Sequence, residues 1–191
     1  MIILLYPSYI KKNYHKEINY KNRGMDLEYL ITQANQYYEE QKKAFIYKKP
    51  TPIKVVKMSF QNNAKRITDA FYESPSTLDF NGIYRGQYIE FDAKMTQNKT
   101  SFPIANVHEH QIKHIKNVYN EKGIVFLIIY MNDEYFLFPA SAFLTFLKNE
   151  TRKSIPYEYI KKNSFTISLT LHGLDYLVAV DKLLEETYEK N

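Results

Sequence analysis

Residues 76–96 read STLDFNGIYRGQYIEFDAKMT, and this stretch decides how we interpret the rest of the chain. It holds two short runs rich in Tyr, Phe and Ile, which is typical of paired β-strands. Arg85-Gly86 lies between the runs and predicts a two-residue hairpin turn. A turn at Asn81-Gly82 is the alternative, because Asn-Gly is statistically the better turn pair, and a bulge at Gly86 would shift the pairing by one residue.

The preferred register brings two acids together. Asp79 then lies directly across from Asp92, and Thr77 lies directly across from Lys94. Because side chains alternate with period two, we expect all four on one face of the hairpin. The alternative turn would instead put Asp79 opposite Tyr84 and leave the second acid without a partner.

Two carboxylates on directly opposed residues, whose Cβ atoms are about 5 Å apart, repel each other unless a cation lies between them. Carboxylate oxygens suit Mg²⁺, which uses one or two protein carboxylates and keeps several waters. Lys94 would sit beside that ion and could orient or deprotonate a water, or neutralise charge that grows on phosphorus. The spacing therefore favours metal-dependent phosphodiester hydrolysis, although an Asp and an Asp-x-Lys are also common surface features of strand pairs.

Six segments of the chain, taken in order, resemble one known family. They are NRGMDLE, KPTPIKVV, PSTLDFNGIYRGQYIEFDAK, SFPIANVHEHQIKH, GIVFLIIY and RKSIPYEYI. They resemble the RecU family of Holliday junction resolvases, within the PD-(D/E)xK nuclease superfamily. The resemblance implies a homodimer, dependent on Mg²⁺ with Mn²⁺ as a substitute, that nicks four-way DNA junctions symmetrically in recombination and repair. It also implies a stalk-like projection that enters the junction, and contact with a RecA-type recombinase.

The resemblance also assigns site residues one by one. Asp79 and Asp92 match the metal carboxylates of the family, and Lys94 matches its catalytic lysine. Thr77 and Gln111 match its further metal-site residues. The expected catalytic set is therefore Lys94, Asp79 and Asp92.

Two departures from the family pattern affect these expectations. Position 92 is Asp where the family usually has Glu, and position 90 is Glu where it usually has Asp. We expect Glu90 to point to the opposite face and therefore not to replace Asp92. Residues 61–63 read Gln-Asn-Asn where the family tends to be basic, and Lys65 and Arg66 are the nearest cations that could take over a phosphate contact.

Charge is concentrated in one part of the chain. Residues 41–68 hold eight Lys or Arg and no Asp or Glu, whereas the whole chain carries a net charge of +5. We expect the stalk at about residues 49–75, and alternation over residues 53–58 predicts a strand-like arm that exposes Lys54 and Lys57. A basic run of this length favours DNA contact over a merely solvated face.

Further candidates lie outside this run. Arg23 opens a predicted helix that extends to about residue 43, where it could bind phosphate, and Glu28 on the same helix could approach the site as an accessory acid. Arg152 and Lys153 form a short basic loop that could grip a phosphate. For each of these the competing interpretation is an ordinary exposed side chain.

His110 and His114 are four residues apart, as in a zinc pair. No third ligand accompanies them and the His-Glu-x-x-His pattern is missing, so we expect DNA contact for His108 or His114 rather than zinc.

The remaining patterns predict a mixed central sheet flanked by helices, an α/β core like that of restriction endonucleases, with the basic stalk projecting from it. Predicted elements are a helix opened by Asn106 and Glu109 and ended at Gly123, a strand buried on both faces over 124–131, a strand over 135–139, and helices over 141–148 and 174–189.

Length and composition agree with a single nuclease domain over residues 1–191. The chain contains no Cys, which suits a reducing cytosol, and its sequence pI is near 9.0, which allows nucleic acid as a partner. Neither a signal segment nor a membrane-spanning run is expected. The predicted function is therefore a junction-resolving endodeoxyribonuclease. The alternatives are an endonuclease of the same fold that acts on other DNA, and a junction-binding or remodelling protein with weak or lost cleavage.

Overall fold

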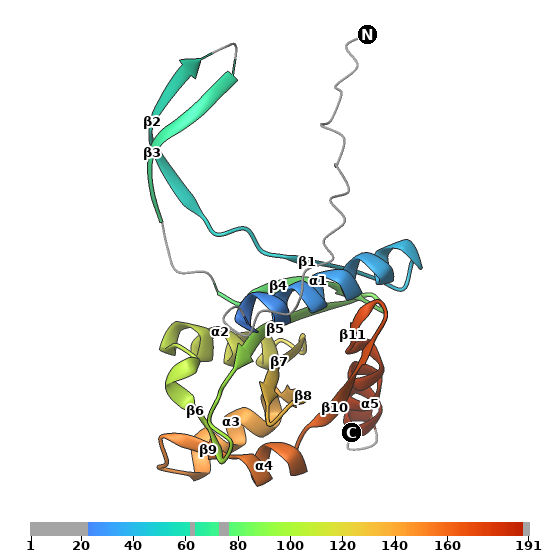
Figure 1. Cartoon of the computed structure of the whole chain (residues 1–191). Coiled ribbons are helices and arrows are strands. Elements are labelled where there is room, and N and C mark those ends of the chain that lie inside the picture. The colour runs from blue at the N-terminus through green and yellow to red at the C-terminus, as the bar shows by residue number, and fades with distance from the viewer. Residues whose placement is uncertain (1–22, 62–63, 73–76, 189–191) are drawn as a thin grey trace.

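A seven-stranded sheet forms the centre of the protein, in the strand order β1-β4-β5-β7-β8-β10-β11. The computed structural model describes residues 23–61, 64–72 and 77–188 (Figure 1). The sheet strands are β1 (Ala44–Lys48), β4 (Phe80–Tyr84), β5 (Gln87–Met95), β7 (Ile124–Met131), β8 (Glu134–Pro139), β10 (Phe165–Thr170) and β11 (Gly173–Asp175). β5 and β7 pair in parallel and the other neighbours pair antiparallel. The predicted mixed α/β fold is confirmed.

Helices cover both faces of the sheet, because each face buries its own apolar cluster. The helices are α1 (Arg23–Glu40), α2 (Glu109–Asn120), α3 (Ala140–Asn149), α4 (Tyr157–Lys162) and α5 (Leu177–Tyr188). α1 and α5 pack on one face, where Ile31 and Val180 are buried. α2, α3 and α4 pack on the other, where Ile115 and Phe143 are buried. β7 contributes to both clusters, as predicted from its continuous apolar run.

The β4–β5 hairpin has the predicted register. Phe80 pairs with Phe91 and Tyr84 with Gln87, which leaves Arg85 and Gly86 as the turn. Both turn residues have positive φ, 50° and 76°, as a tight hairpin turn requires.

Asn81-Gly82 does not form the turn, for a reason that lies outside the hairpin. Gly82 pairs with Ile46 of β1, and a Cβ added to Gly82 would lie 2.0 Å from the carbonyl oxygen of Phe45. The glycine therefore allows β1 to approach β4 closely in the middle of the strand.

A separate two-stranded ribbon, which we call the stalk, stands away from the sheet (Figure 1). It consists of β2 (Ile53–Gln61) paired antiparallel with β3 (Ala64–Tyr72). Every residue of β3 is exposed, and β2 contains a register shift near Val55 and Lys57. The ribbon lies within the projection predicted at about residues 49–75, whose residues 62–63 and 73–75 fall outside the described chain.

Several predicted boundaries need correction. Asn106 does not open a helix: it ends a 3-10 turn, η2 (Ile104–Asn106), and α2 begins at Glu109 after His108 as N-cap. The terminal helix begins at Leu177 rather than at residue 174, because Gly173–Asp175 pairs with β10. A small ribbon of β6 (Ser101–Pro103) and β9 (Ser154–Pro156) was not predicted. No helix in the described part of the chain is long and apolar enough to cross a membrane.

Candidate active site

Two acids and a lysine meet where β5 emerges from the hairpin. Asp92 is fully buried, and its Oδ2 lies 2.8 Å from Nζ of Lys94. The carboxylate of Asp79 accepts the backbone N–H of Ala93 at 3.2 Å. The register predicted from residues 76–96 therefore brings Asp79, Asp92 and Lys94 together.

The electrostatics of Asp92 are unfavourable in the metal-free protein. Burial, followed by the hydrogen bond and negative charge of Asp79, raises the pKa of Asp92 to about 8, although Lys94 opposes the shift. In addition, Oδ1 of Asp92 is buried and has no hydrogen-bond partner. A buried acceptor without a partner beside a second carboxylate fits a cation between the two acids.

The donor set suits a hard divalent cation such as Mg²⁺. In the described residues no three His, Cys, Asp or Glu side chains converge as metal ligands. Two carboxylates with waters completing the coordination shell are characteristic of Mg²⁺, whereas structural zinc sites use four protein ligands.

Gln111 of α2 holds Asp92 from the side. Its Nε2 donates to Oδ2 of Asp92 at 2.9 Å and to the carbonyl of Thr77 at 3.0 Å, while its Oε1 accepts the N–H of His108 at 3.1 Å. Thus the carboxamide directs its nitrogen toward Asp92 and orients that side chain, and the role of Gln111 as a metal ligand stays a prediction. This capping interaction also explains why α2 begins where it does.

Thr77 departs from the predicted pairing with Lys94. The β4–β5 ladder ends at Phe80 and Phe91, and the carbonyl of Asp79 accepts the N–H of Lys49 at 2.7 Å. The chain before β4 therefore follows the end of β1 instead of continuing along β5. As a result Oγ1 of Thr77 lies 3.3 Å from Oε1 of Glu90 and accepts Nζ of Lys49 at 2.7 Å.

The expectation that Glu90 points to the opposite face is wrong. Residues two apart on a strand share a face, so Glu90 lies on the same side of β5 as Asp92. Its side chain is fully buried and contacts Lys49, Thr77, His114 and Tyr88. Burial opposes ionisation of Glu90, but the hydrogen bonds and charges of Lys49 and His114 outweigh it and lower the pKa below its ordinary value.

Sequence reasoning missed Lys49, Glu90 and His114 as neighbours of the site. For Glu90 the signal was present, because the period of two already places it on the face of Asp92. Lys49 comes from the end of β1 and His114 from α2, so only the tertiary structure joins them to Glu90.

Glu28 and Arg23 belong to α1. Oε2 of Glu28 is 2.5 Å from Nζ of Lys48, and this ion pair is largely exposed. The structure pairs Glu28 with Lys48 of β1, and its accessory role stays a prediction. The Arg23 side chain lies outside the part of the chain whose side chains are described, so its phosphate contact also stays a prediction.

The predicted DNA-binding residues form two separate groups. Lys54, Lys57, Lys65 and Arg66 are exposed on the stalk. Lys54 lies over the ring of Phe71 at 6.0 Å, and Lys65 lies over the ring of Phe60 at 5.7 Å. Arg152 and Lys153 are exposed just before β9, at the end of the body away from the stalk (Figure 1).

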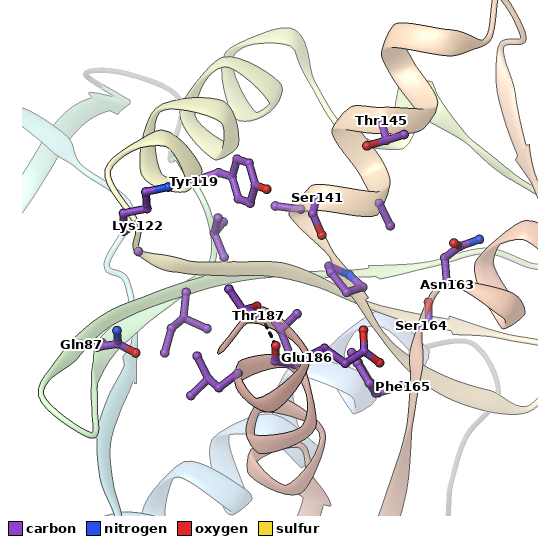
Figure 2. A pocket seen from close by; sticks show the side chains of 18 of the residues that line it. Gln87, Tyr119, Lys122, Ser141, Thr145, Asn163, Ser164, Phe165, Glu186 and Thr187 are labelled. Atoms are coloured by element: carbon purple, nitrogen blue, oxygen red, sulfur yellow. Dashed lines mark hydrogen bonds between the residues drawn. The ribbon is translucent and has the colours of Figure 1, made fainter. Parts of the chain in front are cut away.

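A cavity of about 900 Å³ lies elsewhere, between the end of α2 and the start of α3, with α5 below them (Figure 2). Tyr119, Lys122, Ser141 and Ser164 are among its lining residues, and none of the predicted site residues lines it. The carboxylate site therefore does not coincide with this cavity.

A family model and curated relatives both identify one family. Residues 22–182 match the family described as RecU, recombination protein U. Holliday junction resolvase RecU of Staphylococcus aureus strain JH9 is 45% identical over 179 residues, which cover 90% of this chain and 86% of that protein. The resolvase of strain MRSA252 has the same identity and coverage. Among solved structures, Hjc of Archaeoglobus fulgidus, a Holliday junction resolvase, aligns over 75% of this chain and 95% of its own with a TM-score of 0.42 and 9% identity.

Proposed function

The chain belongs to the RecU family, and on this premise we propose that it is a Holliday junction resolvase, a Mg²⁺-dependent endonuclease that makes symmetric nicks in four-way DNA junctions. The observation that carries the proposal is the grouping of Asp79, Asp92 and Lys94 at the end of β5, with Oδ1 of Asp92 left unpaired.

In this proposal Asp79 and Asp92 hold the metal ion. A Mg²⁺ ion between them would polarise the scissile phosphate and lower the pKa of the attacking water. Thr77 and Gln111 are proposed as the further metal-site residues. In addition, Gln111 would hold Asp92 in place by bonding both Asp92 and the carbonyl of Thr77. Mn²⁺ prefers similar oxygen ligands and would substitute.

Lys94 supplies the positive charge on the protein side. Its ammonium is 2.8 Å from Asp92 and is mostly buried, so its charge is poorly screened by water. From there the ammonium would stabilise the charge that develops on the phosphoryl oxygens. The alternative role, taking a proton from the attacking water, would need the neutral amine of Lys94.

The stalk would enter the junction while the body binds the arms. Phosphates crowd at the centre of a four-way junction, and the exposed cations of the stalk, Lys54, Lys57, Lys65 and Arg66, match that charge. Arg152 and Lys153 would contact an arm farther along the body.

Resolving a junction needs two opposed cuts, so we propose a two-fold homodimer that presents one site to each of the two strands to be cut. The same family membership motivates a RecA-type recombinase as a further partner and the cytoplasm as the compartment.

One observation favours a second candidate, a junction-binding or remodelling protein with weak or lost cleavage. Asp92 is one methylene shorter than the Glu usual in this family, and its Oδ2 is already held by Lys94 and Gln111. An acid held in this way reaches less far toward a metal ion.

Cleavage of matched substrates tests the proposal. A labelled mobile four-way junction, a flap and a linear duplex of the same sequence are each incubated with the protein in Mg²⁺, Mn²⁺ and Ca²⁺. We expect paired symmetric nicks in the junction alone, with Mg²⁺ or Mn²⁺ but not with Ca²⁺. Equal cleavage of all three DNAs would mean a nuclease of another specificity, and tight junction binding without nicks would favour the second candidate.

A further inference from the structure

Glu90 is a buried carboxylate that the proposed chemistry does not use. Its side chain is completely inaccessible to solvent, and a buried charge is strongly unfavourable unless it is paired. Each of its two carboxylate oxygens has its own pair of partners. Oε1 contacts Lys49 and Thr77, while Oε2 lies 2.7 Å from Nε2 of His114 and accepts the hydroxyl of Tyr88 at 3.0 Å.

Two of these partners flank the stalk in the sequence. Lys49 follows directly after β1 and precedes β2, whereas Thr77 lies between β3 and β4. Nζ of Lys49 bonds both Glu90 and the hydroxyl of Thr77, the latter at 2.7 Å. Thus one carboxylate on β5 ties together the segment that enters the stalk and the segment that leaves it.

The same contacts continue to the proposed metal site. The carbonyl of Thr77 accepts Nε2 of Gln111, which also donates to Oδ2 of Asp92. In addition, the N–H of Lys49 donates to the carbonyl of Asp79 at 2.7 Å. An unbroken chain of hydrogen bonds therefore joins the base of the stalk to both acids.

Glu90 is not arranged as a metal ligand itself. Both of its oxygens are taken by protein donors, and in the described residues no third acid or histidine converges with Asp79 and Asp92. Its place in the network is to hold other groups in position.

From this geometry we propose that Glu90 is a positioning residue. It clamps Lys49 and Thr77, and with them the segments that flank the stalk, onto β5, so that a junction bound by the stalk holds Asp79 and Asp92 in their cutting geometry. This inference rests on the proposed resolvase function and adds how recognition of the junction reaches the cutting site.

The first test compares Glu90→Gln with Tyr88→Phe. The Gln side chain has nearly the same shape but cannot neutralise Lys49, whereas Tyr88 bonds the same carboxylate from β5 itself and ties neither end of the stalk. We expect Glu90→Gln to lower the single-turnover rate at saturating protein by about 10- to 100-fold, since a misplacement of about 1 Å can cost that much. Junction affinity in Ca²⁺ should stay within about twofold, and Tyr88→Phe should cut like the wild type.

The second test needs no cutting. In Ca²⁺, binding of a junction should slow amide hydrogen exchange over residues 92–95 in the wild type and in Tyr88→Phe, but not in Glu90→Gln. Without DNA or metal, the amide of Lys49 should exchange faster in Glu90→Gln than in the wild type, because its segment is no longer clamped. If the wild type binds the junction but never nicks it, the resolvase proposal fails while this measurement still decides the role of Glu90.

A double variant guards against misfolding. Lys49→Met with Glu90→Gln removes both charges and so avoids leaving one of them buried without a partner. We expect it to fold like the wild type and to cut as slowly as Glu90→Gln. Full cutting by either variant, or loss of junction affinity in parallel with the rate, would overturn the inference. So would the same junction-induced slowing of exchange over residues 92–95 in Glu90→Gln as in the wild type, or no slowing in the wild type.

Discussion

At the scale of single residues, Asp92 is held in an energetically unfavourable environment for a charged carboxylate. It is buried, it faces Asp79, and one of its oxygens has no partner. The positive charge of Lys94 offsets only part of the effect of burial and of Asp79 on Asp92. A carboxylate in this position is expected to lower the free energy of unfolding when no cation is bound, and to stabilise the bound cation when one is present.

The raised pKa of Asp92 predicts how the stability of the metal-free protein depends on pH. The pKa of Asp92 rises from its ordinary 3.8 to about 8 in the folded protein, so the folded state binds the proton more tightly than the unfolded state. The contribution of Asp92 to metal-free stability should therefore fall as pH rises from about 4 to about 8. Asp92→Asn removes the charge and should stabilise the metal-free protein at pH 8 by on the order of 1–2 kcal/mol. Thermal unfolding between pH 5 and 9 measures this; an Asn variant that is no more stable than the wild type at pH 8 would contradict it.

Lys94 and Asp79 should matter for cutting and not for binding. We expect Lys94→Ala to reduce junction cleavage by about 100- to 1,000-fold, because it removes charge stabilisation at the reacting phosphate, and Asp79→Asn to reduce it at least as much by removing a metal ligand. Both variants should still bind a four-way junction in Ca²⁺ in a gel-shift assay. Loss of folding or of binding instead would show that these residues are structural.

From the sequence, only those site residues could be predicted whose positions follow from the two-residue periodicity of the hairpin strands. Turn and alternation brought Asp79, Asp92 and Lys94 together, because all three belong to one local hairpin. Extrapolating the same ladder to Thr77 failed, since the backbone of Lys49 draws that segment toward β1. Contacts made from other elements carry no local signal.

At the scale of elements, the β4–β5 hairpin is defined by two glycines with different roles. Gly86 has a positive φ and open space around it, whereas Gly82 lies against the backbone of β1. Preference for Asn-Gly turns alone would have chosen the wrong one, because the close approach of β1 is a tertiary requirement.

Alanine at each glycine separates the two roles. Gly82→Ala would put a Cβ 2.0 Å from the carbonyl oxygen of Phe45 and 2.6 Å from Cα of Ile46, both backbone atoms that cannot move without shifting β1. We expect a loss of about 3 kcal/mol in the free energy of unfolding. Gly86→Ala should cost only about 1 kcal/mol, the strain of a positive φ. Urea unfolding measures both, and equal losses would contradict the close approach of β1.

Charge on the stalk leads to a prediction about salt. If Lys54 and Lys65 each neutralise a phosphate, then Lys54→Gln and Lys65→Gln should each reduce the slope of log affinity against log salt by about 0.9 on duplex arms. Lys148→Gln is the matched control, since Lys148 is exposed at the end of α3. Junction binding is titrated in Ca²⁺ at several salt concentrations. An unchanged slope for both stalk variants would mean that the stalk does not contact phosphate.

At the scale of the whole molecule, strongly periodic elements were predictable and marginal ones were not. β7 matches its prediction because its apolar run serves both faces of the sheet. β1, β6, β9, β10 and β11 were missed. β6, β9 and β11 are three residues long, and only one residue of β10 is buried, so tertiary pairing rather than sequence pattern defines them.

The central claim is that Asp92 binds the metal ion that drives junction cleavage. Its most direct test is cleavage of a labelled mobile four-way junction in Mg²⁺ by the wild type beside Asp92→Asn and Asp92→Glu. We predict paired symmetric nicks by the wild type, loss of nicking in the Asn variant, and retention in the Glu variant. Nicking by Asp92→Asn at the wild-type rate would contradict the claim, and a silent wild type activated by Glu would mean that this chain binds junctions without cutting them.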